Sequence, residues 1–246
     1  MNLRFKTGPK TTATAILSLN SVTILKGIEK MSKKVKQSKF LTWFTKITAF
    51  PPTYIFFKPK VYYEDKITSK KKLPKSFILV SNHTSRMDFP LYLMVLFRRN
   101  IRFLMAEVLM NKPVLGWFLY KLGGILANRD SIDFSFMSES LETLDKGESV
   151  GIFPQGRLPV GEKPFPFKPG VGMISLYTDA LILPVYTDGN YGIFKRARIV
   201  IGNPIDARTL CSEDLPEEEK AVAITEALES KIYELKDILA MRVGEI

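Results

Sequence analysis

His83 and Asp88 are the residues of this sequence whose types and spacing most directly suggest proton-transfer chemistry. They lie in the stretch Asn82-His83-Thr84-Ser85-Arg86-Met87-Asp88, and the 246-residue chain holds one histidine. Histidine is the side chain best suited to accept a proton near neutral pH, and a carboxylate on its second ring nitrogen fixes the tautomer and raises the basicity. The pair predicts a general base oriented by an aspartate. A lone loop histidine followed by a helix-capping aspartate would give the same spacing, so other motifs must decide.

The segments around this pair alternate between strand-like and helix-like patterns. The expected strands are 77–81, 101–105, 150–153, 181–186 and 198–201, and the expected helices lie near 89–97, 112–121, 132–144, 172–178 and 216–241. This alternation indicates an α/β fold with a central, mostly parallel or mixed sheet flanked by helices. His83 would then follow the C-terminal end of a strand, where sheets of this class bind their ligands.

Composition and charge limit the class of protein. Cys211 is the single cysteine, so no intramolecular disulfide can form, and the absence of a Cys/His cluster predicts no metal site. The net charge is +11, and it is concentrated in two lysine clusters. The clusters are Lys26, Lys30, Lys33, Lys34, Lys36 and Lys39, and Lys66, Lys70, Lys71, Lys72 and Lys75. No nucleic-acid recognition module accompanies them, so an anionic membrane surface is the expected partner and nucleic acid is not.

The N-terminal third differs from the rest. Residues 1–35 are expected to form a poorly ordered basic extension, and residues 36–72 a helical membrane-interface segment. The stretch 40–57 is aromatic and flanked by lysines, as in interfacial anchors. Lys46 and the pair Pro51-Pro52 interrupt it, so lying on the membrane fits better than crossing it. A buried helix of the core is the alternative.

Two further stretches place glycine and arginine after apolar runs. The first covers residues 122–129 and ends in Arg129. The second reads Gly151-Ile152-Phe153-Pro154-Gln155-Gly156-Arg157. The planar guanidinium of arginine matches a phosphate through two parallel hydrogen bonds. Gly156 permits a close backbone approach, and N–H groups near it are candidate donors to an oxyanion. A buried strand with proline, Leu183-Pro184-Val185-Tyr186, follows.

The order of these four motifs resembles the glycerolipid acyltransferases, and most closely the bacterial 1-acyl-sn-glycerol-3-phosphate acyltransferases. The resemblance covers roughly residues 75–205 and makes 73–246 the expected acyltransferase domain. It implies transfer of a fatty acyl group from acyl-carrier protein or acyl-CoA to the sn-2 hydroxyl of 1-acyl-glycerol-3-phosphate, giving phosphatidic acid, with no cofactor. His83 and Asp88 would be catalytic, and Arg129, Gln155, Gly156 and Arg157 would bind the substrate phosphate. The enzyme would act at the cytoplasmic face of the cell membrane as a peripheral or monotopic protein.

Three positions depart from the family pattern. Gln155 stands where the family commonly has glutamate, Arg157 follows Gly156 directly, and Ala106 falls where many members have lysine. Glutamine keeps the acceptor oxygen of glutamate but loses its charge. An acyltransferase for another lysophospholipid, such as lysophosphatidylethanolamine, is therefore an alternative.

Two other classes stay open. A hydrolase could use the same His83–Asp88 pair, although no Gly-x-Ser-x-Gly motif supplies a serine nucleophile. The second class is a non-catalytic membrane-binding homologue. It stays open because the third motif, residues 151–157, departs from the family pattern at Gln155.

Overall fold

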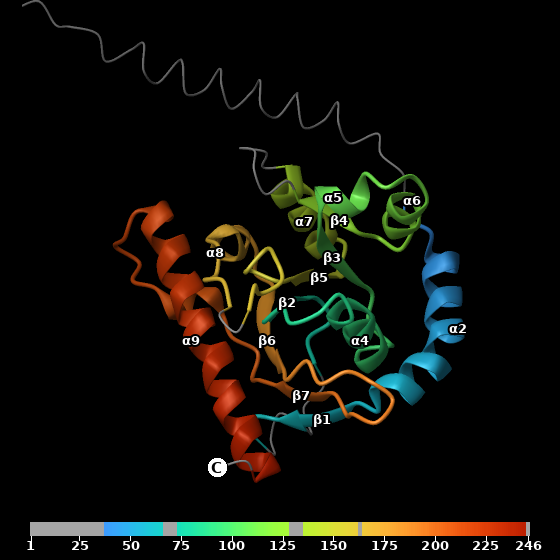
Figure 1. Cartoon of the computed structure of the whole chain (residues 1–246). Helices are drawn as coiled ribbons and strands as arrows, with labels where there is room; N and C mark the ends of the chain where they lie inside the picture. Colours follow the sequence, from blue (N-terminus) through green and yellow to red (C-terminus); the bar gives the residue numbers. More distant parts are fainter. Residues whose placement is uncertain (1–36, 66–72, 128–134, 162–163, 245–246) are drawn as a thin grey trace, which may run out of the picture. The chain divides into compact units, whose positions relative to one another are not determined.

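The computed structural model describes residues 37–65, 73–127, 135–161 and 164–244. Within these ranges seven strands form one sheet in the order β1-β7-β6-β2-β5-β3-β4 (Figure 1). The strands are β1 Lys60–Tyr63, β2 Phe77–Ser81, β3 Ile101–Ala106, β4 Ile125–Ala127, β5 Ser149–Ile152, β6 Leu181–Thr187 and β7 Arg198–Ile201. The expected N-terminal extension, 1–35, lies outside the described residues.

The sheet is parallel through its central part. β2 pairs in parallel with β5 and β6, and β3 pairs in parallel with β5 and β4. β7 runs antiparallel to β6, and β1 runs parallel to β7. The C-terminal ends of β2 to β6 therefore meet at one edge of the sheet, and the loops that follow them can build a common site.

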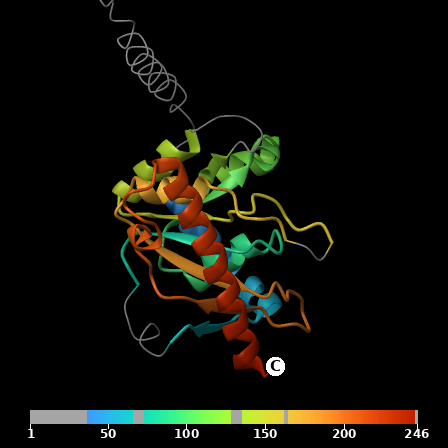
Figure 2. The same ribbon diagram turned by 90° about the vertical axis from the view of Figure 1, so that its left-hand side faces the viewer.

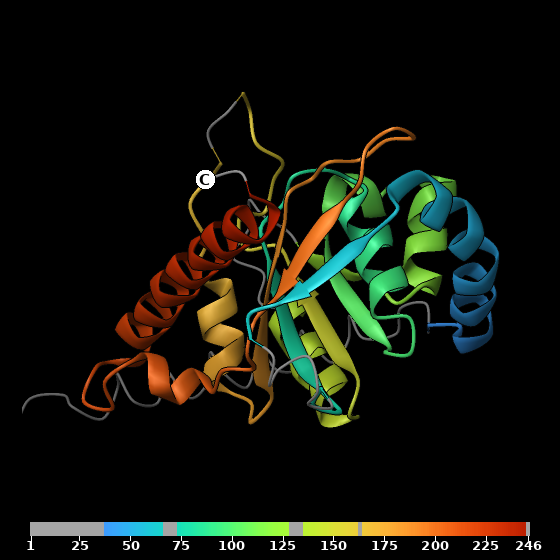
Figure 3. The same ribbon diagram turned by 90° about the horizontal axis from the view of Figure 1, so that it is seen from below.

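Helices cover both faces of this sheet. They are α2 Lys39–Phe57, α4 Asp88–Val95, α5 Glu107–Met110, α6 Pro113–Lys121, α7 Ser135–Asp145, α8 Gly170–Leu176, the 3-10 turn η1 Ala207–Leu210 and α9 Glu217–Val243. α4 to α6 lie on one face and α7 to α9 on the other, with α9 running along the sheet (Figure 2). α2 lies outside α4, at the opposite side of the molecule from α9 (Figures 1 and 3).

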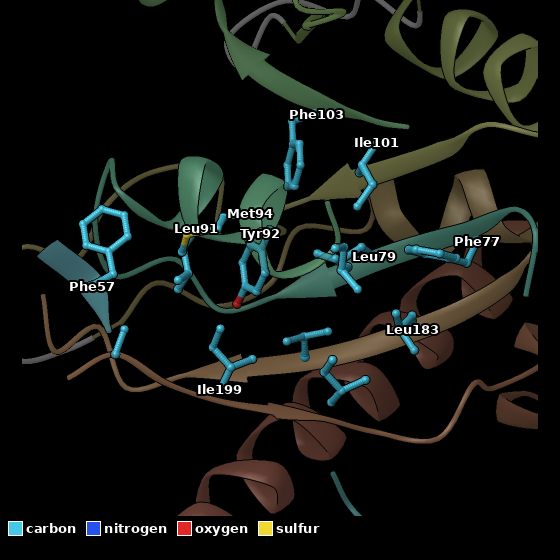
Figure 4. Packing of buried hydrophobic residues seen from close by; sticks show 14 of the residues in the cluster. Phe57, Phe77, Leu79, Leu91, Tyr92, Met94, Ile101, Phe103, Leu183 and Ile199 are labelled. Carbon is cyan, nitrogen blue, oxygen red and sulfur yellow. The ribbon is translucent and has the colours of Figure 1, made fainter. Parts of the chain in front are cut away.

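Alternate residues of β2 show how the two layers are built. Phe77 and Leu79 pack among α4, α5 and α6, whereas Ile78 and Val80 pack among α7, α8 and α9. Figure 4 shows the first of these clusters, with Leu79 and Tyr92 near its centre and Phe77 at one end. Because both faces are covered, every residue of β2 is buried, and the strand reads as an unbroken apolar run.

The predicted α/β class, with a mostly parallel sheet and helices on both faces, is confirmed. The five predicted strands are present with ends that differ by at most one residue. Two further strands, β1 and β4, were not predicted; they are four and three residues long. β1 lies within the predicted membrane-interface segment 36–72, so the sheet already begins there. The predicted helix 132–144 starts outside the described residues and is observed from Ser135.

α2 is one continuous helix of 19 residues, with Pro51 and Pro52 inside it. Its buried residues are Thr42 and Phe57, so it is not the buried core helix that the sequence left open. Eight large apolar side chains on it are exposed, namely Phe40, Trp43, Phe44, Ile47, Phe50, Tyr54, Ile55 and Phe56. Across the described ranges, we find no helix with the length and apolarity that a bilayer crossing requires.

Close packing of α8 on α9 gives a test of the fold. A Cβ added at Gly172 would lie 2.0 Å from the carbonyl oxygen of Ala221, so Gly172→Ala must separate the two helices. We expect it to lower the free energy of unfolding by about 1–3 kcal/mol, the usual cost of overpacking. Gly170→Ala in the same helix is the control, because its Cβ would meet only the Phe136 ring at 3.7 Å. Equal denaturation midpoints for the two variants would contradict this packing.

Candidate active site

The end of β2 and the start of α4 bring His83 and Asp88 together. His83 lies two residues after β2, Asp88 is the first residue of α4, and the intervening loop folds back so that the two side chains meet. His83 Nδ1 and Asp88 Oδ2 are 2.8 Å apart. Since a carboxylate accepts hydrogen bonds, Nδ1 is the nitrogen that carries the proton. Nε2 is then left with its lone pair, which is the state that a general base needs.

Asp88 is fully buried, and five donors converge on its carboxylate. Oδ2 accepts hydrogen bonds from the N–H groups of Thr84 at 2.7 Å and Ser85 at 2.9 Å, besides that from His83. Oδ1 accepts from Thr84 Oγ1 at 2.9 Å and from the Tyr191 hydroxyl. A buried carboxylate needs such partners, because desolvation without them is costly. The bonds fix the direction in which Oδ2 faces the imidazole.

The imidazole of His83 is also held by stacking. Its ring lies on Phe153, with centroids 4.4 Å apart and planes inclined by 18°. Phe153 in turn stacks on Phe103 of β3, at 5.6 Å. The His83 side chain keeps 20% of its surface exposed, so the ring is oriented by its neighbours but stays open to a substrate.

Gln155 ties the loop after β5 to the loop after β2. Its side chain is 3% exposed, and its Oε1 accepts a hydrogen bond of 2.6 Å from the backbone N–H of His83. Gly156 follows with a φ of +68°, and its N–H donates to the carbonyl of Phe153 at 2.9 Å. This tight turn is the reason for glycine at this position. The Gly156 N–H, a candidate oxyanion donor from the sequence, is thus engaged within its own turn.

Of the two predicted phosphate-binding arginines, the structure describes one, Arg157. Arg157 is exposed, and its guanidinium lies over the Phe165 ring at 5.2 Å from the centroid. Arg129 lies outside the described residues, and in the sequence it comes two positions after the last residue of β4. The phosphate-binding role of both arginines stays a prediction.

Tyr191 is a residue of this site that the sequence analysis missed. It lies in the loop between β6 and β7, 103 residues after Asp88, to which it donates its hydroxyl hydrogen. Burial, followed by the nearby charge of Asp88, raises the pKa of Tyr191 far above its usual value. The phenol therefore stays protonated and acts only as a donor. Its place between Gly189 and Gly192, after the fourth motif, was the available signal.

An apolar groove lies between α2, α4 and α6, and one residue of its wall, Phe89, directly follows Asp88 in the chain. It has a volume of about 150 Å³, and its walls include Phe50, Phe89, Leu93 and Phe118. The residues in the described part of the chain form no group of three or more His, Cys, Asp or Glu side chains that could hold a metal ion.

Comparison with known proteins identifies relatives that are similar in sequence and one solved structure that is similar in fold. The family model described as Acyltransferase matches residues 61–188. A 1-acyl-sn-glycerol-3-phosphate acyltransferase of Bacillus subtilis is 26% identical over 181 residues, which cover 71% of this chain and 89% of that protein. One of Borreliella burgdorferi is 32% identical over 133 residues, 52% of this chain and 53% of that protein. The crystal structure of the 1-acyl-sn-glycerophosphate (LPA) acyltransferase, PlsC, from Thermotoga maritima superposes with a TM-score of 0.54 at 27% identity, covering 79% of this chain and 78% of that one.

Gln155 can be tested through the hydrogen bond that it accepts. Gln155→Leu leaves the part-buried N–H of His83 without its acceptor, which we expect to lower the free energy of unfolding by about 1–3 kcal/mol. Gln155→Glu keeps an acceptor oxygen at the same place, so its activity should stay close to that of the wild type. Urea denaturation and acyl-transfer rates measure the two effects. A leucine variant as stable and as active as the wild type would show that the bond contributes nothing.

Tyr191 can be tested as a positioning residue. Tyr191→Phe removes a hydrogen bond to a charged group, of the kind worth about 1.5–3 kcal/mol, so kcat should fall roughly 10- to 100-fold with little change in KM. The single histidine also gives one set of imidazole signals in NMR spectra, and their chemical shifts should move in the variant. Tyr177→Phe is the control, because that tyrosine lies on the surface and bonds Glu217. Unchanged imidazole chemical shifts would contradict the positioning role.

Proposed function

The chain belongs to the Acyltransferase family, and we propose that it transfers a fatty acyl group from an acyl thioester to the sn-2 hydroxyl of 1-acyl-glycerol-3-phosphate, forming phosphatidic acid. The observation that carries this proposal is the hydrogen bond between His83 Nδ1 and Asp88 Oδ2, which leaves Nε2 as a base. The names of the relatives support the choice of acceptor.

The proposed reaction needs no nucleophile from the protein. Nε2 of His83 takes the proton of the acceptor hydroxyl while the hydroxyl oxygen attacks the thioester carbonyl, and Asp88 stabilises the imidazolium that forms. The tetrahedral intermediate then expels the thiolate, which recovers the proton from His83. One C–O bond forms and one C–S bond breaks. Cys211, far beyond the motifs in sequence, has no part in these steps.

The position of Gln155 bears on the acceptor. The side chain at this position is buried and accepts a hydrogen bond from the His83 N–H, a task that needs an oxygen but no charge. The exchange of glutamate for glutamine is therefore compatible with the usual acceptor. Arg129 and Arg157 would bind its phosphate. Ala106, at the end of β3, stands where many members of the family have a lysine, so this position supplies no cation for a phosphate. Another lysophospholipid is therefore the second candidate for the acceptor.

We propose that the acyl chain of a substrate enters the groove between α2, α4 and α6, whose polar lining is small. The donor would be acyl-carrier protein or acyl-CoA, with no further cofactor. We place the enzyme on the cytoplasmic face of the cell membrane as a peripheral or monotopic protein. The exposed aromatic side chains of α2 would lie in the interface, and lysines beside them would meet anionic head groups.

Acyl transfer by the purified protein tests the reaction and the base together. His83→Ala should lower the rate by at least about 100-fold, as the loss of a general base predicts. Asp88→Asn should lower it as well, because an amide cannot stabilise the imidazolium. Asp179→Asn makes the same change at a surface carboxylate and should leave the rate unchanged.

The acceptor and the donor are decided in the same assay. Lysophosphatidic acid and lysophosphatidylethanolamine are compared as acceptors, with acyl-carrier protein and acyl-CoA as donors. Transfer only to lysophosphatidylethanolamine would keep the mechanism and change the substrate. If the wild type transferred to neither acceptor from either donor, the proposed function would be wrong.

A further inference from the structure

The loop between β6 and β7 exposes apolar side chains at its tip. The tip, Ile193-Phe194-Lys195-Arg196, is exposed along its whole length, and Phe194 is 99% exposed. Two adjacent apolar side chains in water, one of them a phenylalanine, leave unfavourable apolar surface uncovered. The other two residues of the tip are basic, and none is acidic. The 193–196 tip thus combines apolar and cationic groups, as membrane-interface segments do.

The tip adjoins the end of α2. The ammonium group of Lys58 donates to the carbonyl of Ile193 at 2.8 Å, and the N–H of Ala197 donates to the carbonyl of Phe57, also at 2.8 Å. The last turns of α2 expose Tyr54, Ile55 and Phe56. Figures 1 and 3 show the orange loop beside the light blue end of this helix. The apolar surface of α2 therefore continues onto the tip.

We propose that the 193–196 tip inserts into the membrane interface as a second anchor beside α2. Phe194 and Ile193 would enter the boundary between head groups and acyl chains, and Lys195 and Arg196 would bind anionic head groups. This inference rests on the membrane association proposed above. It adds a second point of contact, which fixes the rotation of the domain about α2.

The same loop carries the donor to Asp88. Tyr191 lies two residues before the tip, its ring packs on Phe57 at 5.1 Å, and its hydroxyl reaches Asp88. A tip held in the interface would hold Tyr191 through this short connection. Membrane contact and the orientation of the base thus share one loop.

Binding to vesicles tests the second anchor. Vesicles of phosphatidylcholine with phosphatidylglycerol, and of phosphatidylcholine alone, are sedimented with each variant. Phe194→Ser should weaken partitioning about fivefold or more, because part of a phenylalanine is no longer transferred from water. Met241→Ser, at a 68% exposed position of α9, the helix at the opposite side of the molecule from α2, should not weaken it. Thermal unfolding of Phe194→Ser should match the wild type, since a fully exposed side chain has no packing to lose.

Charge reversal tests the cationic part. Arg196→Glu should weaken binding only to vesicles with phosphatidylglycerol, whereas Lys236→Glu on α9 should bind like the wild type.

The link between the tip and the base is tested by NMR. The signals of the single imidazole should move when the wild type binds vesicles, and not when Phe194→Ser is mixed with them at the same lipid concentration.

The outcomes separate this inference from the proposed function. If Phe194→Ser bound vesicles as the wild type does while Phe40→Ser lost binding, the tip would not be an anchor and α2 would be. If the wild type transferred acyl groups in detergent but bound no vesicle, the reaction would stand and both membrane proposals would fall. Failure of acyl transfer alone would leave the binding result, and with it the anchor, intact.

Discussion

The buried carboxylate of Asp88 sets the requirements that the surrounding chain must meet. A carboxylate removed from water is destabilised by several kcal/mol unless donors replace its hydration. Here the donors come from three sources: the backbone and side chain of the loop after β2, the imidazole, and a phenol from the loop after β6. None of these segments could shift without exposing the charge or removing a donor. The geometry of the base is thus a consequence of satisfying one buried charge.

The sheet supplies this convergence, because β2 lies between the two strands whose loops support it. On one side Gln155, after β5, accepts the N–H of His83. On the other side the amide of Asn82 forms two hydrogen bonds with the backbone of Thr187, at the end of β6. The loop that bears the histidine is therefore bound to both neighbouring strands. In a parallel sheet the C-terminal ends of adjacent strands coincide, so residues more than 70 positions apart reach one place.

The sequence predicted the parts of this arrangement that are local or periodic. His83 and Asp88 lie in one short stretch, and the buried strands show as apolar runs. Tyr191 could not be predicted, because its partner is 103 residues away and a tyrosine in a glycine-flanked loop is typical of many loops. Gln155 was expected near the substrate, but its acceptor oxygen faces the backbone of the histidine loop, a direction that no pattern of residue types encodes. The continuity of α2 through Pro51 and Pro52 was likewise hidden, since proline usually ends a helix.

The exposed surface of α2 has an energetic meaning beside the buried site. α2 exposes eight large apolar side chains, although the same chain buries every residue of β2. The exposure is therefore not explained by a general lack of a hydrophobic core. Surface of this kind is favourable only when another apolar phase covers it. The helix ends at Phe57, whose ring meets Tyr191, and Tyr191 reaches Asp88. The hydroxyl of a lysophospholipid lies close to the interface that holds its acyl chain. Under the proposed function α2 lies in that interface, and a base positioned through the end of this helix is placed where the hydroxyl would be.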